Sequence, residues 1–161
     1  MDRHAKLDLR ASLKRVEAGG IPLRAEQRLA EEAGEHRKLF TSDLSVSEYL
    51  LARDAGCEPI SQVMGSCIFH VGQGPSGRPT ENKELTQITQ SLYDARELAM
   101  ERMQVEAEAL GAAGIVGVTI DENNHTWGPS ILEFSAVGTA VVPIRDDHHI
   151  PKPTLVLSVG D

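Results

Sequence analysis

The sequence has 161 residues, of which 40% are hydrophobic, 25% are charged and 4% are aromatic, and its formal net charge is −8. A chain of this length buries enough surface to fold without disulfides or metals, and two cysteines do not make a disulfide framework. No apolar run approaches the roughly 18 residues that a membrane span needs, and no apolar segment of a secretory signal follows the first residues. We therefore expect a soluble, cytoplasmic protein with a core of aliphatic side chains.

Charge is divided unevenly along the chain. Residues 1–38 carry a net charge of +2, whereas residues 39–161 carry −10. An acidic domain with few aromatic side chains repels phosphate backbones and offers few surfaces for stacked bases, so we expect no nucleic-acid partner. The basic side chains of the first segment are expected on solvated helix faces. The alternatives are that they bind a polyanion, or that they dock onto the acidic remainder of the same or a neighbouring chain.

Two short helices are predicted at the start of the chain. The first covers residues 5–18 and ends at two glycines, and the second begins at Pro22 and ends at Gly34. The apolar face of the first helix consists of Leu9, Leu13 and Val16. Isolated helices of this length are marginal in water, so we expect both to pack on the core or on another subunit.

A capping box and a strand follow. Ser45 and Glu48 have the capping-box spacing at the start of a helix that ends at Gly56. From Ile60 to Val71 the pattern becomes extended, with apolar residues on both faces, which favours a strand covered on two sides. One face carries Ile60, Met64 and Ile68, and the other carries Val63, Phe69 and Val71. Residues 72–79 are rich in Gly and Pro and are expected to form a loop.

A long amphipathic helix is predicted from Asn82 to Leu110, because apolar residues recur there at steps of three and four. The residues expected to pack are Leu92, Ala95, Ala99 and Met103. At 1.5 Å per residue this helix would be about 43 Å long, more than the width of a small domain. We expect its overhang to pack against a neighbouring subunit; the alternative is a helix with a frayed end lying along one sheet.

Two strands complete the core. One covers residues 115–120 and the second ends at residues 137–142, with a polar loop at 122–129 between them. Residues 155–159 are a candidate for a last strand, at a sheet edge or across a subunit interface. The expected fold is α+β, a small mixed sheet with one long helix packed on it and an N-terminal helical arm. The predicted units are the arm at 1–38, the core domain at 39–143 and a tail at 144–161.

Five segments combine into a family pattern. They are residues 63–66, 93–103, 106–112, 114–118 and 138–141. This combination resembles the YbjQ family of small bacterial proteins over roughly residues 40–142. The resemblance implies an α/β domain that binds heavy metals and assembles into homopentamers, as single rings or stacks of rings. It carries over no ligand motif residue by residue, and Gln73 to Pro79 departs from the Gly-Gly-Arg-Ser segment common in the family.

The candidate metal ligands are Cys57, Cys67 and His125. No Cys-x-x-Cys or His-x-x-x-His spacing connects them, although a symmetric ring could supply one ligand from each subunit. The alternative interpretations are a buried core thiol at Cys67 and a solvent-exposed imidazole at His125. His148 and His149 in the tail would chelate a transition metal only loosely. The implied cofactor is a transition or heavy-metal ion, and the sequence itself requires none.

No catalytic arrangement is recognisable. Neither cysteine has a demonstrable histidine base, and the glycine-rich segment at 72–78 lacks the Gly-Lys-Ser/Thr of a phosphate loop. We interpret the chain as a non-enzymatic, cytoplasmic protein that assembles with itself, with a further protein partner through residues 1–38 and no membrane partner. The alternative is a heavy-metal sensor or buffer that uses the cysteine and histidine ligands.

Overall fold

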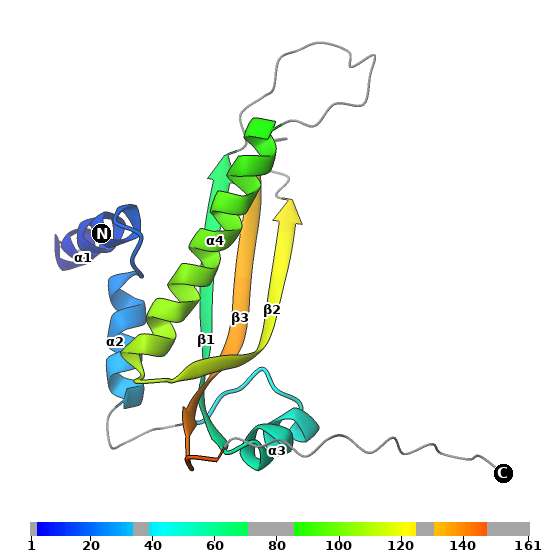
Figure 1. Cartoon of the computed structure of the whole chain (residues 1–161). Coiled ribbons are helices and arrows are strands. Elements are labelled where there is room, and N and C mark those ends of the chain that lie inside the picture. The colour runs from blue at the N-terminus through cyan, green and yellow to red at the C-terminus, as the bar shows by residue number, and fades with distance from the viewer. Residues whose placement is uncertain (1–2, 34–38, 71–85, 125–130, 148–161) are drawn as a thin grey trace, which may run out of the picture.

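The structure, a computed structural model, describes residues 3–33, 39–70, 86–124 and 131–147. Its elements, in chain order, are α1 (Arg3–Glu17), α2 (Leu23–Ala33), α3 (Val46–Asp54), β1 (Cys57–His70), α4 (Thr86–Ala109), β2 (Gly114–Asn124) and β3 (Ile131–Pro143). The described strands form one sheet in the order β1-β3-β2. The long helix α4 lies along one face of this sheet, with α1 and α2 beside β1 (Figure 1). The predicted α+β class is confirmed.

The sheet is antiparallel in both of its pairings rather than mixed. β3 pairs antiparallel with β1 on one side and with β2 on the other. The crossover through α4 makes β1 and β2 run parallel to each other, as a strand–helix–strand unit does. β3 then lies between them, so these two parallel strands never become neighbours.

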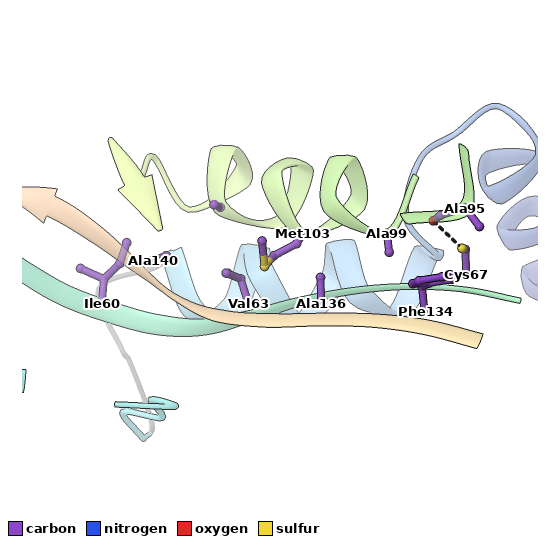
Figure 2. Close-up of a cluster of buried hydrophobic side chains, with 10 residues drawn as sticks. Ile60, Val63, Cys67, Ala95, Ala99, Met103, Phe134, Ala136 and Ala140 are labelled. Atoms are coloured by element: carbon purple, nitrogen blue, oxygen red, sulfur yellow. Dashed lines mark hydrogen bonds between the residues drawn. The ribbon is translucent and has the colours of Figure 1, made fainter. Parts of the chain in front are cut away.

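The core lies between α4 and the sheet. Ala95, Ala99 and Met103 of α4 are fully buried, and Leu92 packs against the same cluster (Figure 2). The helix backbone comes close to β1 because Gly65 has no side chain: a Cβ at this position would lie 2.1 Å from the carbonyl oxygen of Ala99. The positions predicted to pack therefore contact the sheet of their own chain.

Strand β1 has one face under α4 and one open face. In contrast to the predicted pattern, Ile60 is buried in the core, whereas Met64 and Ile68 are 47% and 61% exposed. The register shifts between Pro59 and Ser61, and this bulge turns Ile60 toward α4. The prediction of a strand covered on both faces is therefore wrong for the described part of the single chain.

The opposite face of the sheet is covered at one end by the segment that precedes α3. Thr139 is fully buried there; its hydroxyl accepts the amide of Asp43 and is bonded to the hydroxyl of Ser42, both at 3.1 Å. Leu44 packs against Gly117, which has a φ of +63° and forms a bulge in β2. These contacts hold α3 at one end of the sheet (Figure 1).

Local signals place the ends of the first three helices close to the predicted positions. α1 ends before Gly19, and the carbonyl of Pro22 accepts the first amide bonds of α2. Ser45 and Glu48 form both bonds of the predicted capping box. Hydrogen bonds from the Ser45 hydroxyl and amide lower the pKa of the Glu48 carboxyl. Gly56, with a φ of +84°, follows the end of α3.

Strand β2 is longer than predicted. Residues 121–124 extend it because they keep pairing with β3, as Asp121 does with Ser135. Several predictions fall outside the described residues. They concern residues 34–38, 71–85, 125–130 and 148–161, and with them His125, His148, His149 and the strand at 155–159.

Candidate functional site

Cys57 and Cys67, two of the three predicted metal ligands, lie far apart in the described structure. Cys57 begins β1 and Cys67 lies near its end. Ten residues of extended strand separate them by roughly 30 Å. His125 lies outside the described residues. No three Cys, His, Asp or Glu side chains in the described segments are grouped closely enough to hold a metal ion.

The thiol of Cys67 is part of the core. It is 4% exposed, and its Sγ donates to the carbonyl oxygen of Ala95 at 2.8 Å (Figure 2). Burial raises the pKa of this thiol, and the nearby charge of Arg102 opposes the rise only in part. Because metal ligation and nucleophilic attack need the thiolate, this position favours a packing role within the single chain.

A second group of residues was not predicted and is better connected. The carboxylate of Glu106 on α4 is buried, and its Oε2 accepts from the guanidinium of Arg28 on α2 at 2.8 Å and from the amide of Met64 on β1 at 3.0 Å. Arg28 also pairs with Glu32 at 3.1 Å, and the other oxygen of Glu32 accepts the hydroxyl of Ser61 at 2.6 Å. This chain of bonds joins α2, α4 and β1.

Arg102, one helical turn before Glu106, makes a parallel link to α1. Its guanidinium donates to the carbonyl oxygen of Ser66 on β1 at 2.7 Å and to that of Val16 on α1 at 3.1 Å. Beside it, a groove of about 530 Å³ runs between the arm, β1 and α4. Among its apolar lining residues are Val16, Ile21, Pro22, Met64, Phe69 and Leu98.

The arm therefore docks onto its own core in the described structure, which was one of the alternatives left open by its charge. We define the arm–edge link as Arg28, Glu106 and Arg102, together with the backbone amide of Met64 and the backbone carbonyl of Ser66 on β1. A sequence signal for it exists. Glu106 follows Ala99 and Met103 at helical spacing, so a carboxylate continues the apolar stripe and needs a partner.

A third feature is an apolar surface around α3. None of the residues of this helix is buried, and Val46 is 78% exposed. We define the α3 patch as Leu39, Phe40, Val46, Leu50 and Leu51, all of which are exposed. The ring of Phe40 contacts the ring of Tyr49 edge-on with centroids 5.8 Å apart, which holds the preceding segment against the helix. Several exposed apolar groups on one short segment mark interaction surfaces more often than isolated ones.

Comparison with known proteins identifies the family. Residues 81–143, which include α4, β2 and β3, match the YbjQ family, described as "putative heavy-metal-binding". A UPF0145 protein of Clostridioides difficile is 37% identical over 92 residues, which are 55% of this chain and 80% of that protein. The chain belongs to the YbjQ-like UPF0145 family.

Other relatives of this chain differ from it in length. A UPF0145 protein of Acinetobacter baylyi is 39% identical over 70 residues, 44% of this chain and 63% of that protein. An encapsulin nanocompartment protein of Mycobacterium tuberculosis is 49% identical over 112 residues, 70% of this chain. The chain spans only 42% of the length of that relative. None of the described helices is long and apolar enough to cross a membrane.

Proposed function

We propose that this YbjQ-like chain is a non-enzymatic protein of the cytoplasm that works by assembling with copies of itself into a ring, of five subunits or a stack of such rings. The observation that carries the proposal is the α3 patch. A helix whose large apolar side chains all face solvent gains little from folding alone, and its burial against another subunit is worth about 25 cal/mol per Å².

The comparisons support an assembling protein. The relative from M. tuberculosis is named as a protein of an encapsulin nanocompartment, and a compartment is an assembly of many chains. The aligned region covers 70% of this chain, more than the matched family domain alone. This similarity supports the proposal that the chain takes part in an assembly.

Native mass spectrometry of the full, untagged chain tests the proposal. We expect one defined oligomer, a multiple of five subunits. Leu50→Glu should reduce the oligomer, because it places a charge in the α3 patch. Gln104→Glu adds the same charge at an exposed position of α4, outside the α3 patch, and should leave the oligomer intact. A monomeric wild type, or equal masses for both variants, would refute the role of this surface.

A heavy-metal sensor or buffer is the second candidate, and the family description favours it. Since Cys57 and Cys67 lie far apart along β1, a site that uses both thiols needs ligands from different subunits. It predicts a whole number of ions per ring in the same spectra, lost after chelator treatment, and weaker binding in Cys67→Ala. Identical masses before and after chelation, together with unchanged binding of added Zn²⁺ by the variant, would contradict it.

A further inference from the structure

The two outer strands of the sheet, β1 and β2, differ in whether the backbone groups at their outer edges have hydrogen-bond partners. An unpaired strand edge is a template for another strand, and proteins usually cover it or place charges on it. On β1 the arm–edge link does this: Glu106 accepts the outward amide of Met64, and Arg102 donates to the outward carbonyl of Ser66. The helices α1 and α2 lie beside the same edge (Figure 1).

The outer edge of β2 has no such cover among the described elements. Within them, β2 contacts β3 along its length and α4 lightly, and its later part lies on the side of the sheet away from α1 and α2 (Figure 1). It contains no Lys, Arg or Pro. Its bulge at Gly117 interrupts the pairing with β3 once, and the residues from Thr119 to Asn124 then pair with β3 without a further shift.

The direction of the β2 backbone groups follows from the alternation of an antiparallel ladder. The amide of Met64 points away from β3, so that of Gly65 points toward β3, where its register partner is Ala136. The next residue of β3, Val137, then directs its backbone toward β2, where its partner is Thr119.

The same alternation fixes the rest of the strand. Thr119 and Asp121 direct their amides toward β3, whereas Ile120 and Glu122 between them direct theirs to the open edge. The backbone groups of Ile120 and Glu122 are therefore free of β3 and regularly spaced, which is what a further strand needs to form a ladder.

We propose that β2 pairs antiparallel with β2 of a second copy across a two-fold axis, joining two three-stranded sheets into one. The inference rests on the proposed self-assembly and names one of its contacts. A second copy is the fitting partner because the arm–edge link occupies the edge of β1 at Met64 and Ser66, so among the described strands β2 is the edge that each copy offers. A two-fold contact of this kind joins two rings rather than closing one.

Charge selects the register of this pairing. A two-fold axis at Ile120 places Thr119 opposite Asp121 and Val118 opposite Glu122 of the other copy. An axis at Asp121 would place two Asp121 carboxylates opposite each other, and like charges in opposite positions destabilise a strand pair. The axis at Ile120 is therefore the favoured one.

Hydrogen exchange resolved to single amides tests the pairing in the full chain. If β2 pairs with a second copy, the outward amides of Ile120 and Glu122 are protected together with the inward amides of Thr119 and Asp121. Their protection should decrease on dilution below the concentration at which the oligomer dissociates. Rapid exchange of both outward amides in the intact oligomer would overturn the pairing while leaving the proposed self-assembly standing.

Variants of the chain distinguish two segments that could cover the edge of β2, namely β2 of a second copy and the segment at 155–159. Glu122→Pro removes one outward donor at an exposed edge position where proline is tolerated, and Glu122→Ala is the matched control. We expect the proline variant to associate about tenfold more weakly across the two-fold, since each pair of copies loses two hydrogen bonds. Equal association of both variants would overturn the inference.

The segment at 155–159 is the other strand-like candidate. The double substitution Val156→Pro and Leu157→Pro prevents it from forming a regular strand. Protection of Ile120 and Glu122 should be unchanged in this variant. Loss of their protection, or protection that does not depend on protein concentration, would show that the edge is covered by the chain's own tail and would overturn the inference.

Discussion

Gly65 is the residue whose lack of a side chain lets α4 reach the sheet. In Gly65→Ala the new Cβ would lie 2.1 Å from the carbonyl oxygen of Ala99 and 2.5 Å from the amide nitrogen of Met103, both helix backbone atoms. The helix must shift to accept it, so we expect the free energy of unfolding to fall by about 3 kcal/mol or more. Urea denaturation measures this.

Gly114→Ala is the control for this substitution. Its Cβ would have only an ordinary contact, at 3.8 Å with a side-chain methyl of Val141. We expect a change below about 1 kcal/mol. A Gly65→Ala variant as stable as this control would show that α4 does not approach β1 as closely as described.

Cys67 should be the less reactive of the two thiols. It is buried, hydrogen-bonded to Ala95 and has a raised pKa, whereas Cys57 is only half-buried. We expect iodoacetamide at pH 8 to label Cys57 at least about tenfold faster in the native protein, with the difference lost in denaturant. Equal native rates would contradict the buried thiol.

The raised pKa of Cys67 also predicts how stability depends on pH. The folded state prefers the protonated thiol, so this contribution is fully present below the ordinary thiol pKa of about 8.5 and is lost as pH rises through the folded pKa. Cys67→Ala should lack this alkaline loss. The measurement is the slope of the unfolding free energy against pH above about 8.5 in the wild type and in the variant. Identical slopes would contradict a contribution from Cys67.

At the scale of elements, the features that could be predicted from the sequence are those that depend on residues close together in the chain. The capping box at Ser45 and the stripe of Ala95, Ala99 and Met103 depend on spacings within one helix. The outward turn of Met64 was not predictable in this way, because a bulge near Ile60 changes the parity of the strand and depends on its pairing with β3.

The arm–edge link was not predicted from the sequence, because its hydrogen bonds join distant parts of the chain. Arg28 and Glu106 are 78 positions apart, and no local pattern relates them. The sequence contains one half of the signal, a carboxylate at Glu106 on the buried stripe of α4. The other half, the guanidinium that pairs with it, lies on a helix that the sequence predicts only as an amphipathic arm.

The link between Arg28 and Glu106 should be energetically coupled. In a double-mutant cycle with Arg28→Ala and Glu106→Gln, we expect a coupling energy of about 1–3 kcal/mol, because Glu106 is buried. The exposed pair Arg53–Glu58, with side chains 47% and 31% accessible, provides the matched cycle. We expect a clearly smaller coupling energy there, because solvent screens an exposed pair. Equal couplings in the two urea-denaturation cycles would show that the arm is not held by this pair.

At the scale of the whole molecule, the proposed self-assembly gives the arm and the α3 patch opposite roles. The arm closes the β1 edge with two charged residues of α4, while the α3 patch leaves five apolar side chains in solvent. We propose that these two features direct assembly, because one surface is available to other copies and another is withheld. The arm would then stabilise a defined oligomer by preventing a competing contact.

Removal of residues 1–38 tests this division. The truncation deletes Arg28 and Val16, which hold Glu106 and Arg102 at the β1 edge. With the edge uncovered, strands of other copies compete for it, so we expect a lower melting temperature and a broad mass distribution in place of one defined oligomer. Native mass spectrometry and a thermal melt provide the two measurements.

A lysine on the same edge should reverse the effect on assembly. Met64 is exposed on the open face of β1, and Met64→Lys adds a charge that disfavours edge-to-edge pairing without altering the core. In the truncated chain we expect this substitution to restore a narrow mass distribution while the melting temperature stays low. In the full-length chain it should leave the mass distribution unchanged, because the arm already closes the edge. A truncated chain that keeps the wild-type mass and melting temperature would show that the arm does not protect β1.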